Sequence, residues 1–159
     1  MVMKQIVSVI LGSLLLIAGA GCKKHQDGGY SNTADYLVVG RVGGFIAQPT
    51  KVFYLVTATE FRKDTAVVTP PADSAGLNFN IVLSTTDLNA VTGIRSQIPA
   101  ELVASGSGNV GSALPDAGYL EVIARVKGTT YTWYFQADIS HTSTAVQAFA
   151  ASAEKVCDY

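Results

Sequence analysis

The stretch YLEVIARVKGTTYTWYFQAD, Tyr119–Asp138, predicts the β-hairpin that decides the fold. A two-residue turn at Lys127 and Gly128 sets the register of the two strands, so each residue before the turn has a defined partner after it. The facing apolar pairs are then Leu120 with Phe135, Val122 with Trp133, Ala124 with Tyr131 and Val126 with Thr129, and the opposite face carries Glu121, Arg125, Thr130, Thr132 and Gln136. Such agreement between alternation and turn position is typical of a hairpin with one buried face.

Three segments before the hairpin predict further strands. DYLVVGRVGG, residues 35–44, and KVFYLVTATEF, residues 51–61, are rich in β-branched and aromatic side chains. After a break at Pro70 and Pro71, LNFNIVL at residues 77–83 predicts a strand with Phe79, Ile81 and Leu83 on one side.

Two helices are predicted from caps and apolar spacing. In STTDLNAVTGIRSQIP, residues 84–99, Thr85 or Thr86 caps the helix, Asp87 lies in its first turn and Pro99 ends it. The last helix begins in SHTSTAVQAFAASAEKVCDY, residues 140–159, with Ser140, Thr142 or Ser143 as its cap. Its apolar stripe contains Val146, Phe149, Ala150, Ala153 and Cys157.

This order of elements predicts an α+β fold. We expect a mostly antiparallel sheet of about five to six strands with two helices on one face, in a single domain over residues 35–159. An all-β sandwich is the alternative if both predicted helices are wrong.

The N-terminal segment indicates export. Between Lys4 and Cys22 lies IVSVILGSLLLIAGAG, an uncharged run of sixteen residues at positions 6–21. As a helix it covers only about 24 Å, against a hydrocarbon core of about 30 Å, so it is short for a membrane span. A basic start, an apolar centre and a small-residue end are typical of a secretory signal.

The end of that segment, AGAGC, resembles the lipobox of bacterial lipoproteins. The resemblance implies that Ala20 and Gly21 occupy the cleavage subsites and that residues 1–21 are removed. It also implies that Cys22 is linked to diacylglycerol through a thioether and that its new amino terminus is acylated, for example with palmitate. Gly19 stands where the family usually has leucine. An ordinary cleaved signal and an uncleaved anchor are the alternatives. Residues 22–34 are polar and glycine-bearing and predict a flexible tether, with Lys23 and Lys24 either at the lipid headgroups or simply solvated.

The charge balance gives no reason to propose nucleic acid as a partner. Eleven basic and twelve acidic side chains leave a formal net charge of −1, whereas phosphate binding needs clustered Lys and Arg. GSGNVG, Gly106–Gly111, matches a dinucleotide-binding pattern in letters only, because a helical segment precedes it where a strand is required. We therefore expect a flexible loop there and no nucleotide cofactor.

Candidate catalytic and metal-binding residues are sparse. A hydrolase would need a nucleophile, a base and an acid, and the sequence offers Ser140 or Ser143, His141 and Asp138 for these roles. The GxSxG motif of many hydrolases is absent from the sequence. A helix start is the commoner role for such a segment. The second histidine, His25, lies in the tether, so the sequence predicts no metal site. Cys157 is expected either to pack in the core or to react, and a disulfide with Cys22 becomes possible if Cys22 is not acylated.

The polar face of the hairpin is the one candidate binding surface. Tyr119, Arg125, Tyr134 and Gln136 lie on it, and Tyr and Arg are favoured at recognition surfaces. The sequence thus favours a lipid-anchored, non-catalytic module that binds an envelope protein or a glycan. A small envelope hydrolase and a structural spacer in an envelope assembly are the alternatives.

Overall fold

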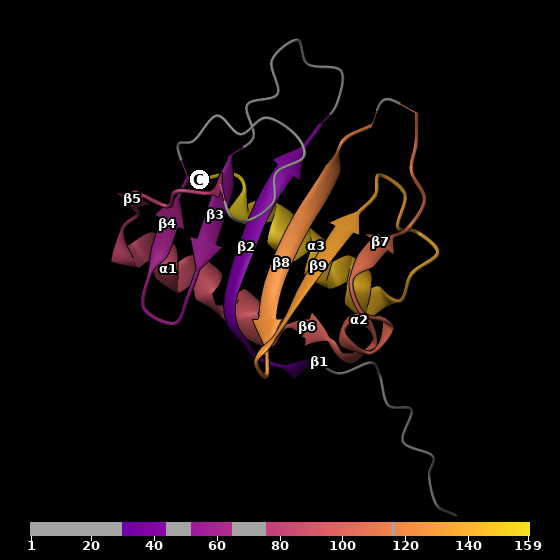
Figure 1. Cartoon of the computed structure of the whole chain (residues 1–159), viewed down its shortest axis with the longest axis horizontal. Coiled ribbons are helices and arrows are strands. Elements are labelled where there is room, and N and C mark those ends of the chain that lie inside the picture. The colour runs from indigo at the N-terminus through magenta and orange to yellow at the C-terminus, as the bar shows by residue number, and fades with distance from the viewer. Residues whose placement is uncertain (1–29, 44–51, 65–75, 116) are drawn as a thin grey trace, which may run out of the picture.

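The computed structural model describes residues 30–43, 52–64, 76–115 and 117–159, and the N-terminal predictions, including Ala20, Gly21, Cys22 and His25, lie outside them. Strands and helices follow one another along the chain as shown in Figure 1. The elements are β1 (Tyr30–Asn32), β2 (Ala34–Val42), β3 (Phe53–Val56), β4 (Phe61–Lys63), β5 (Ile81–Val82), α1 (Thr85–Val91), the 3-10 helix η2 (Thr92–Ser96), β6 (Ile98–Pro99), α2 (Ala100–Ser105), β7 (Gly108–Val110), β8 (Tyr119–Val126), β9 (Thr129–Phe135) and α3 (Thr144–Val156).

The predicted hairpin is confirmed in position and register. β8 and β9 pair antiparallel, with Val122 opposite Trp133 and Leu120 opposite Phe135. Lys127 and Gly128 both have positive φ, 50° and 82°. Two central residues with positive φ match the twist of the flanking strands, which is why this short turn fixes the register.

The α+β fold is also confirmed, and its main sheet has seven strands where about five to six were expected. Seven strands form one sheet in the order β5-β4-β3-β2-β8-β9-β7, and every neighbouring pair is antiparallel except β7 with β9. β1 and β6 form a separate two-stranded pair. Helices, not a second large sheet, cover the main core, so the sandwich alternative does not describe the observed fold (Figure 1).

Two of the predicted strands differ in detail. The strand expected at residues 51–61 is interrupted between β3 and β4, because the Thr57 hydroxyl accepts hydrogen bonds from the backbone N–H groups of Thr59 and Glu60 and so builds a turn. Within residues 77–83 only Ile81–Val82 form a strand, β5, and the N–H of Leu83 also donates to the carbonyl oxygen of Phe61 at 2.8 Å. Phe79 and Leu83 were expected on one side, but they pack in clusters on opposite faces of the sheet.

The loop predicted at Gly106–Gly111 is wrong in part, because Gly108–Val110 forms β7. This strand runs parallel to β9, with Gly108 beside Trp133 and Val110 beside Phe135. The indole Nε1 of Trp133 donates to the carbonyl oxygen of Gly106 at 2.9 Å. A contact between distant parts of the chain therefore makes a strand from glycine-rich sequence.

The first helix is shorter than predicted and has a different cap. Ser84 caps α1 through a capping box with Asp87, in place of Thr85 or Thr86. After Val91 the chain tightens into η2, forms β6 and re-enters a helix at Ala100, with Pro99 at the N-cap of α2. Pro99 thus ends one segment and begins the next, as its fixed φ and missing N–H permit.

The last helix is close to its prediction. Ser143 caps α3, its hydroxyl accepting from the N–H of Val146. Val146, Phe149, Ala150 and Ala153 are buried against the sheet. α3 crosses behind β2, β8 and β9 in Figure 1, so the main core lies between this helix and the sheet.

The opposite face of the sheet carries a smaller apolar cluster. Val38, Val42, Phe53 and Ile123 are buried there.

Tyr30–Asn32 and Ala34 fall within the residues expected to be tether, and the structure pairs them with β6 and β8. Ala34 is 1% exposed, so ordered packing begins before residue 35.

Candidate functional site

Tyr119 and Tyr134 lie together on the face of the hairpin away from Trp133. Their rings meet edge to face, with 5.5 Å between centroids and 87° between planes. Burial raises the pKa of the Tyr119 hydroxyl, and the negative charge of Glu121 adds to the effect. Glu121 itself is only 4% exposed, although it lies on the predicted polar face.

Gln136 joins the two tyrosines at the same end of the hairpin. Its amide Nε2 donates to Asn109 Oδ1 and to the carbonyl oxygen of Tyr134, both at 3.2 Å. These two bonds orient the side chain across the junction between β9 and β7.

Arg125 is separated from the other three predicted residues. It faces Thr130 near the turn, six residues along β8 from Tyr119, which corresponds to about 20 Å of strand. Its guanidinium Nε lies 3.8 Å from Asp35 Oδ2, with both side chains more than half exposed. The structure therefore divides the candidate binding surface, with Tyr119, Tyr134 and Gln136 at one end and Arg125 at the other.

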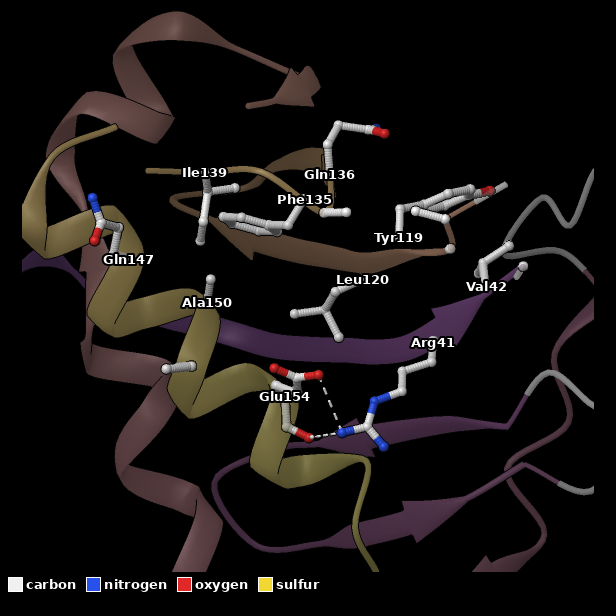
Figure 2. A pocket seen from close by; sticks show the side chains of 15 residues that line it. Arg41, Val42, Tyr119, Leu120, Phe135, Gln136, Ile139, Gln147, Ala150 and Glu154 are labelled. Carbon is white, nitrogen blue, oxygen red and sulfur yellow. Dashed lines mark hydrogen bonds and ion pairs between the residues drawn. The ribbon is translucent and has the colours of Figure 1, made fainter. Parts of the chain in front are cut away.

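A hollow of about 470 Å³ lies beside this first group, between α3 and the ends of β2, β8 and β9 (Figure 2). We call it the α3 hollow. It is lined by Arg41, Val42, Gly43, Ala117, Gly118, Tyr119, Leu120, Phe135, Gln136, Ala137, Ile139, Gln147, Ala150, Ala151 and Glu154. Its volume falls within the range of small-molecule sites, about 300–1,000 Å³.

Close backbone packing forms one wall of the α3 hollow, and small side chains form the wall opposite. A Cβ on Gly118 would come within 2.6 Å of the carbonyl oxygen of Gly43, so the start of β8 lies directly against the end of β2. Opposite, α3 presents Ala150 and Ala151. Larger residues at these helix positions would occupy the space.

The floor of the α3 hollow is apolar and its rim is polar. Figure 2 shows Phe135, Leu120 and Ile139 between the helix and the strands. On the helix, the Gln147 amide Nε2 donates to the carbonyl oxygens of Ser140 at 3.3 Å and Thr142 at 2.8 Å. An apolar floor with a few fixed polar groups is the usual composition of a ligand site.

Arg41 and Glu154 contribute the charged part of the rim. Arg41 Nη2 lies 3.3 Å from Glu154 Oε1 and 3.2 Å from Asp158 Oδ1, as the dashed lines of Figure 2 indicate for Glu154. The cation of Arg41 is thereby balanced by carboxylates of the last helix and its C-terminal end.

Sequence reasoning missed Arg41, Gln147 and Glu154. A signal for Arg41 existed, because alternation along β2 puts it on the same face as Leu37 and Val39, which are buried under the helices. A charged residue on the core-facing side of a strand, near the end of that strand, indicates that the buried core stops there and that solvent reaches the site. Gln147 and Glu154 flank the apolar stripe of α3, and nothing in their spacing sets them apart from solvent-facing residues.

Asp138 and Ser140 form a local turn. Asp138 Oδ1 accepts from the backbone N–H and the hydroxyl of Ser140, at 3.0 and 2.7 Å. These hydrogen bonds lower the pKa of Asp138, and the neighbouring His141 adds a small effect in the same direction. His141 is exposed, and among the described residues no hydrogen bond joins it to a serine hydroxyl.

Cys157 follows the last turn of α3 and is half-buried beside Arg41. Burial raises the pKa of its thiol to about 11.

Within the described ranges, no three His, Cys, Asp or Glu side chains gather as a metal site. A second, mostly apolar hollow of about 340 Å³ lies on the other face of the sheet, lined by Tyr36, Val38, Leu55, Thr57, Leu77, Phe79 and Ile123.

Comparison with known proteins adds no function. No family model, no curated protein and no solved structure matches this chain. In the part of the chain that the structure describes, no helix has the length and hydropathy needed to cross a bilayer.

Proposed function

We propose that this chain is a lipoprotein of a bacterial cell envelope, anchored through acylated Cys22, whose domain binds an envelope component without transforming it. The anchor is supported by the sequence AGAGC and the uncharged run before it. Two or three acyl chains hold a protein on a membrane, whereas one chain binds only marginally.

The α3 hollow is the observation that carries the binding part of the proposal. It has the size of a ligand site, an apolar floor at Phe135, and two side-chain amides held in place by hydrogen bonds. Groups that are already oriented lose little conformational entropy when a ligand binds. This arrangement supports recognition.

The groups near Asp138 support a structural role over catalysis. The carboxylate of Asp138 already accepts two hydrogen bonds from Ser140, and its lowered pKa makes it a weak base. A hydrolase that uses Asp138 and His141 is the competing function, and a spacer without a ligand is the other.

The test compares two alanines of α3 that are both exposed. Ala151 lines the α3 hollow and Ala148 does not, so Ala151→Phe fills it while Ala148→Phe serves as the matched control. The full chain and both variants are purified from membranes in a zwitterionic detergent, and bound small molecules are extracted and identified by mass spectrometry.

We expect one envelope-derived compound to accompany the unaltered chain and Ala148→Phe, and to be at least tenfold depleted in Ala151→Phe. Equal amounts in all three, or none in any, would contradict binding in the α3 hollow. Conversion of an added envelope fraction that stops in His141→Ala would favour the hydrolase.

A further inference from the structure

We infer that the ligand of the α3 hollow is a neutral saccharide. This inference rests on the proposed binding function and names the chemical class of its ligand. It is argued from the hydrogen-bonding groups, the charge and the apolar surface of the hollow.

The rim offers hydrogen-bond acceptors that are fixed in place. The Nε2 groups of Gln136 and Gln147 each donate to two oxygens of the protein, which uses both of their amide hydrogens. Among the hydrogen bonds of the described residues, none reaches the carbonyl oxygen of either side chain. Each carbonyl oxygen accepts two hydrogen bonds, so the rim matches a ligand that carries donors.

The rim also offers donors. Only one terminal nitrogen of Arg41, Nη2, bonds to Glu154 and Asp158. A guanidinium has five N–H groups, so others remain available to a ligand. A ligand that fits both the amides and Arg41 must carry donors and acceptors together, as every hydroxyl group does.

The charge of the α3 hollow weighs against an anionic ligand. Arg41 and Glu154 are its only ionised lining residues among those described, and they are paired with each other. Because Arg41 also pairs with Asp158, carboxylates already match its guanidinium, so an anionic ligand would find no free positive charge and would lose hydration without compensation.

The floor accounts for the other side of the ligand. Phe135, Leu120 and Ile139 present apolar surface between the polar groups. A pyranose ring has an apolar C–H face and a rim of hydroxyls, and that face can lie on the partly exposed side chains of Leu120 and Ile139, whereas Phe135 is only 3% exposed. A purely apolar ligand would instead cover the amides and the ion pair without replacing their hydrogen bonds to water, which is costly.

The test is binding of the full chain, in a zwitterionic detergent with no sugar headgroup, to an immobilised panel. The panel holds neutral oligomers of glucose, mannose, galactose and N-acetylglucosamine, acidic oligomers of galacturonic acid, basic oligomers of glucosamine, and unstructured peptides. Ala151→Phe and Ala148→Phe are measured beside the unaltered chain.

We expect at least one neutral oligomer to bind, with Kd raised tenfold or more by Ala151→Phe and less than twofold by Ala148→Phe. Binding to acidic or basic oligomers or peptides only, neutral binding that Ala151→Phe leaves unchanged, or binding to no member of the panel would overturn the inference. If an unrelated compound accompanies the purified chain and is lost in Ala151→Phe, the proposed function stands and the saccharide inference fails. If no compound accompanies the purified chain and no member of the panel binds, both fail.

Discussion

The ring of Phe53 lies directly on Gly40, its partner in the neighbouring strand. The two residues are paired between β2 and β3, and a Cβ built on Gly40 would lie 2.4 Å from Phe53 Cδ1. Phe53 is 1% exposed, so its ring is enclosed and cannot move aside. Only glycine at position 40 leaves room for the Phe53 ring in the smaller apolar cluster, on the face of the sheet opposite the main core.

Gly40→Ala is expected to destabilise the domain by about 1–3 kcal/mol, the usual cost of forcing an extra methyl group into a packed cluster. Urea unfolding of the full chain measures the effect. Gly93→Ala is the control, because its Cβ would have no neighbour nearer than Gln97 Nε2 at 3.9 Å. That control should be neutral or stabilising by up to about 1 kcal/mol. Equal stability of both variants would show that Phe53 repacks freely.

Two arginines allow an exposed ion pair to be compared with a partly buried hydrogen bond. Arg41 and Glu154 are 51% and 61% exposed, so Arg41→Met should lower the free energy of unfolding by less than about 1 kcal/mol. Arg95 Nη2 instead donates to the carbonyl oxygen of Ala34 at 2.6 Å, in a partly buried position. Arg95→Met should cost about 1.5–3 kcal/mol, since a charged donor is lost. A larger loss of unfolding free energy for Arg41→Met than for Arg95→Met would contradict the view that the partly buried hydrogen bond stabilises the fold more than the exposed ion pair.

Cys157 should behave as a protected thiol. Burial raises its pKa to about 11, and in Cys22→Ala it is the only cysteine. Alkylation by iodoacetamide should be slow at pH 8, rise only as the pH approaches 11, and become fast when urea unfolds the chain. Because the thiol keeps its proton in the folded chain and releases it near pH 9 when unfolded, stability should fall as pH rises from about 9 to about 11. Rapid alkylation of the folded chain at pH 7 would identify a reactive thiol instead.

Local sequence predicted the hairpin and α3 because their signals are local. Alternation and a positive-φ turn set the register of β8 and β9, and the cap at Ser143 with the stripe from Val146 sets the last helix. β7 could not be predicted in this way. Its glycines become a strand because Trp133, more than twenty residues later, pairs with Gly108 and donates to Gly106.

The α3 hollow was beyond local prediction for the same reason. It needs the end of β2, the start of β8 and the middle of α3 to meet, and sequence spacing gives no distance between Arg41 and Glu154. Tyr119 and Gln136 were predicted as binding residues and do line it. Arg125 lies at the other end of the hairpin. Two residues on the same face of a long strand can be far apart, so a shared face did not predict that Arg125 lies near Tyr119.

The proposal that this domain acts at a membrane surface is tested most directly by intact mass spectrometry of the chain extracted from membranes, beside Cys22→Ala. We predict a mass equal to residues 22–159 plus diacylglycerol and an amino-terminal acyl chain, and the absence of this species in the variant. A soluble chain without lipid that retains Cys22 would contradict the anchor and make a disulfide between Cys22 and Cys157 the next structure to examine.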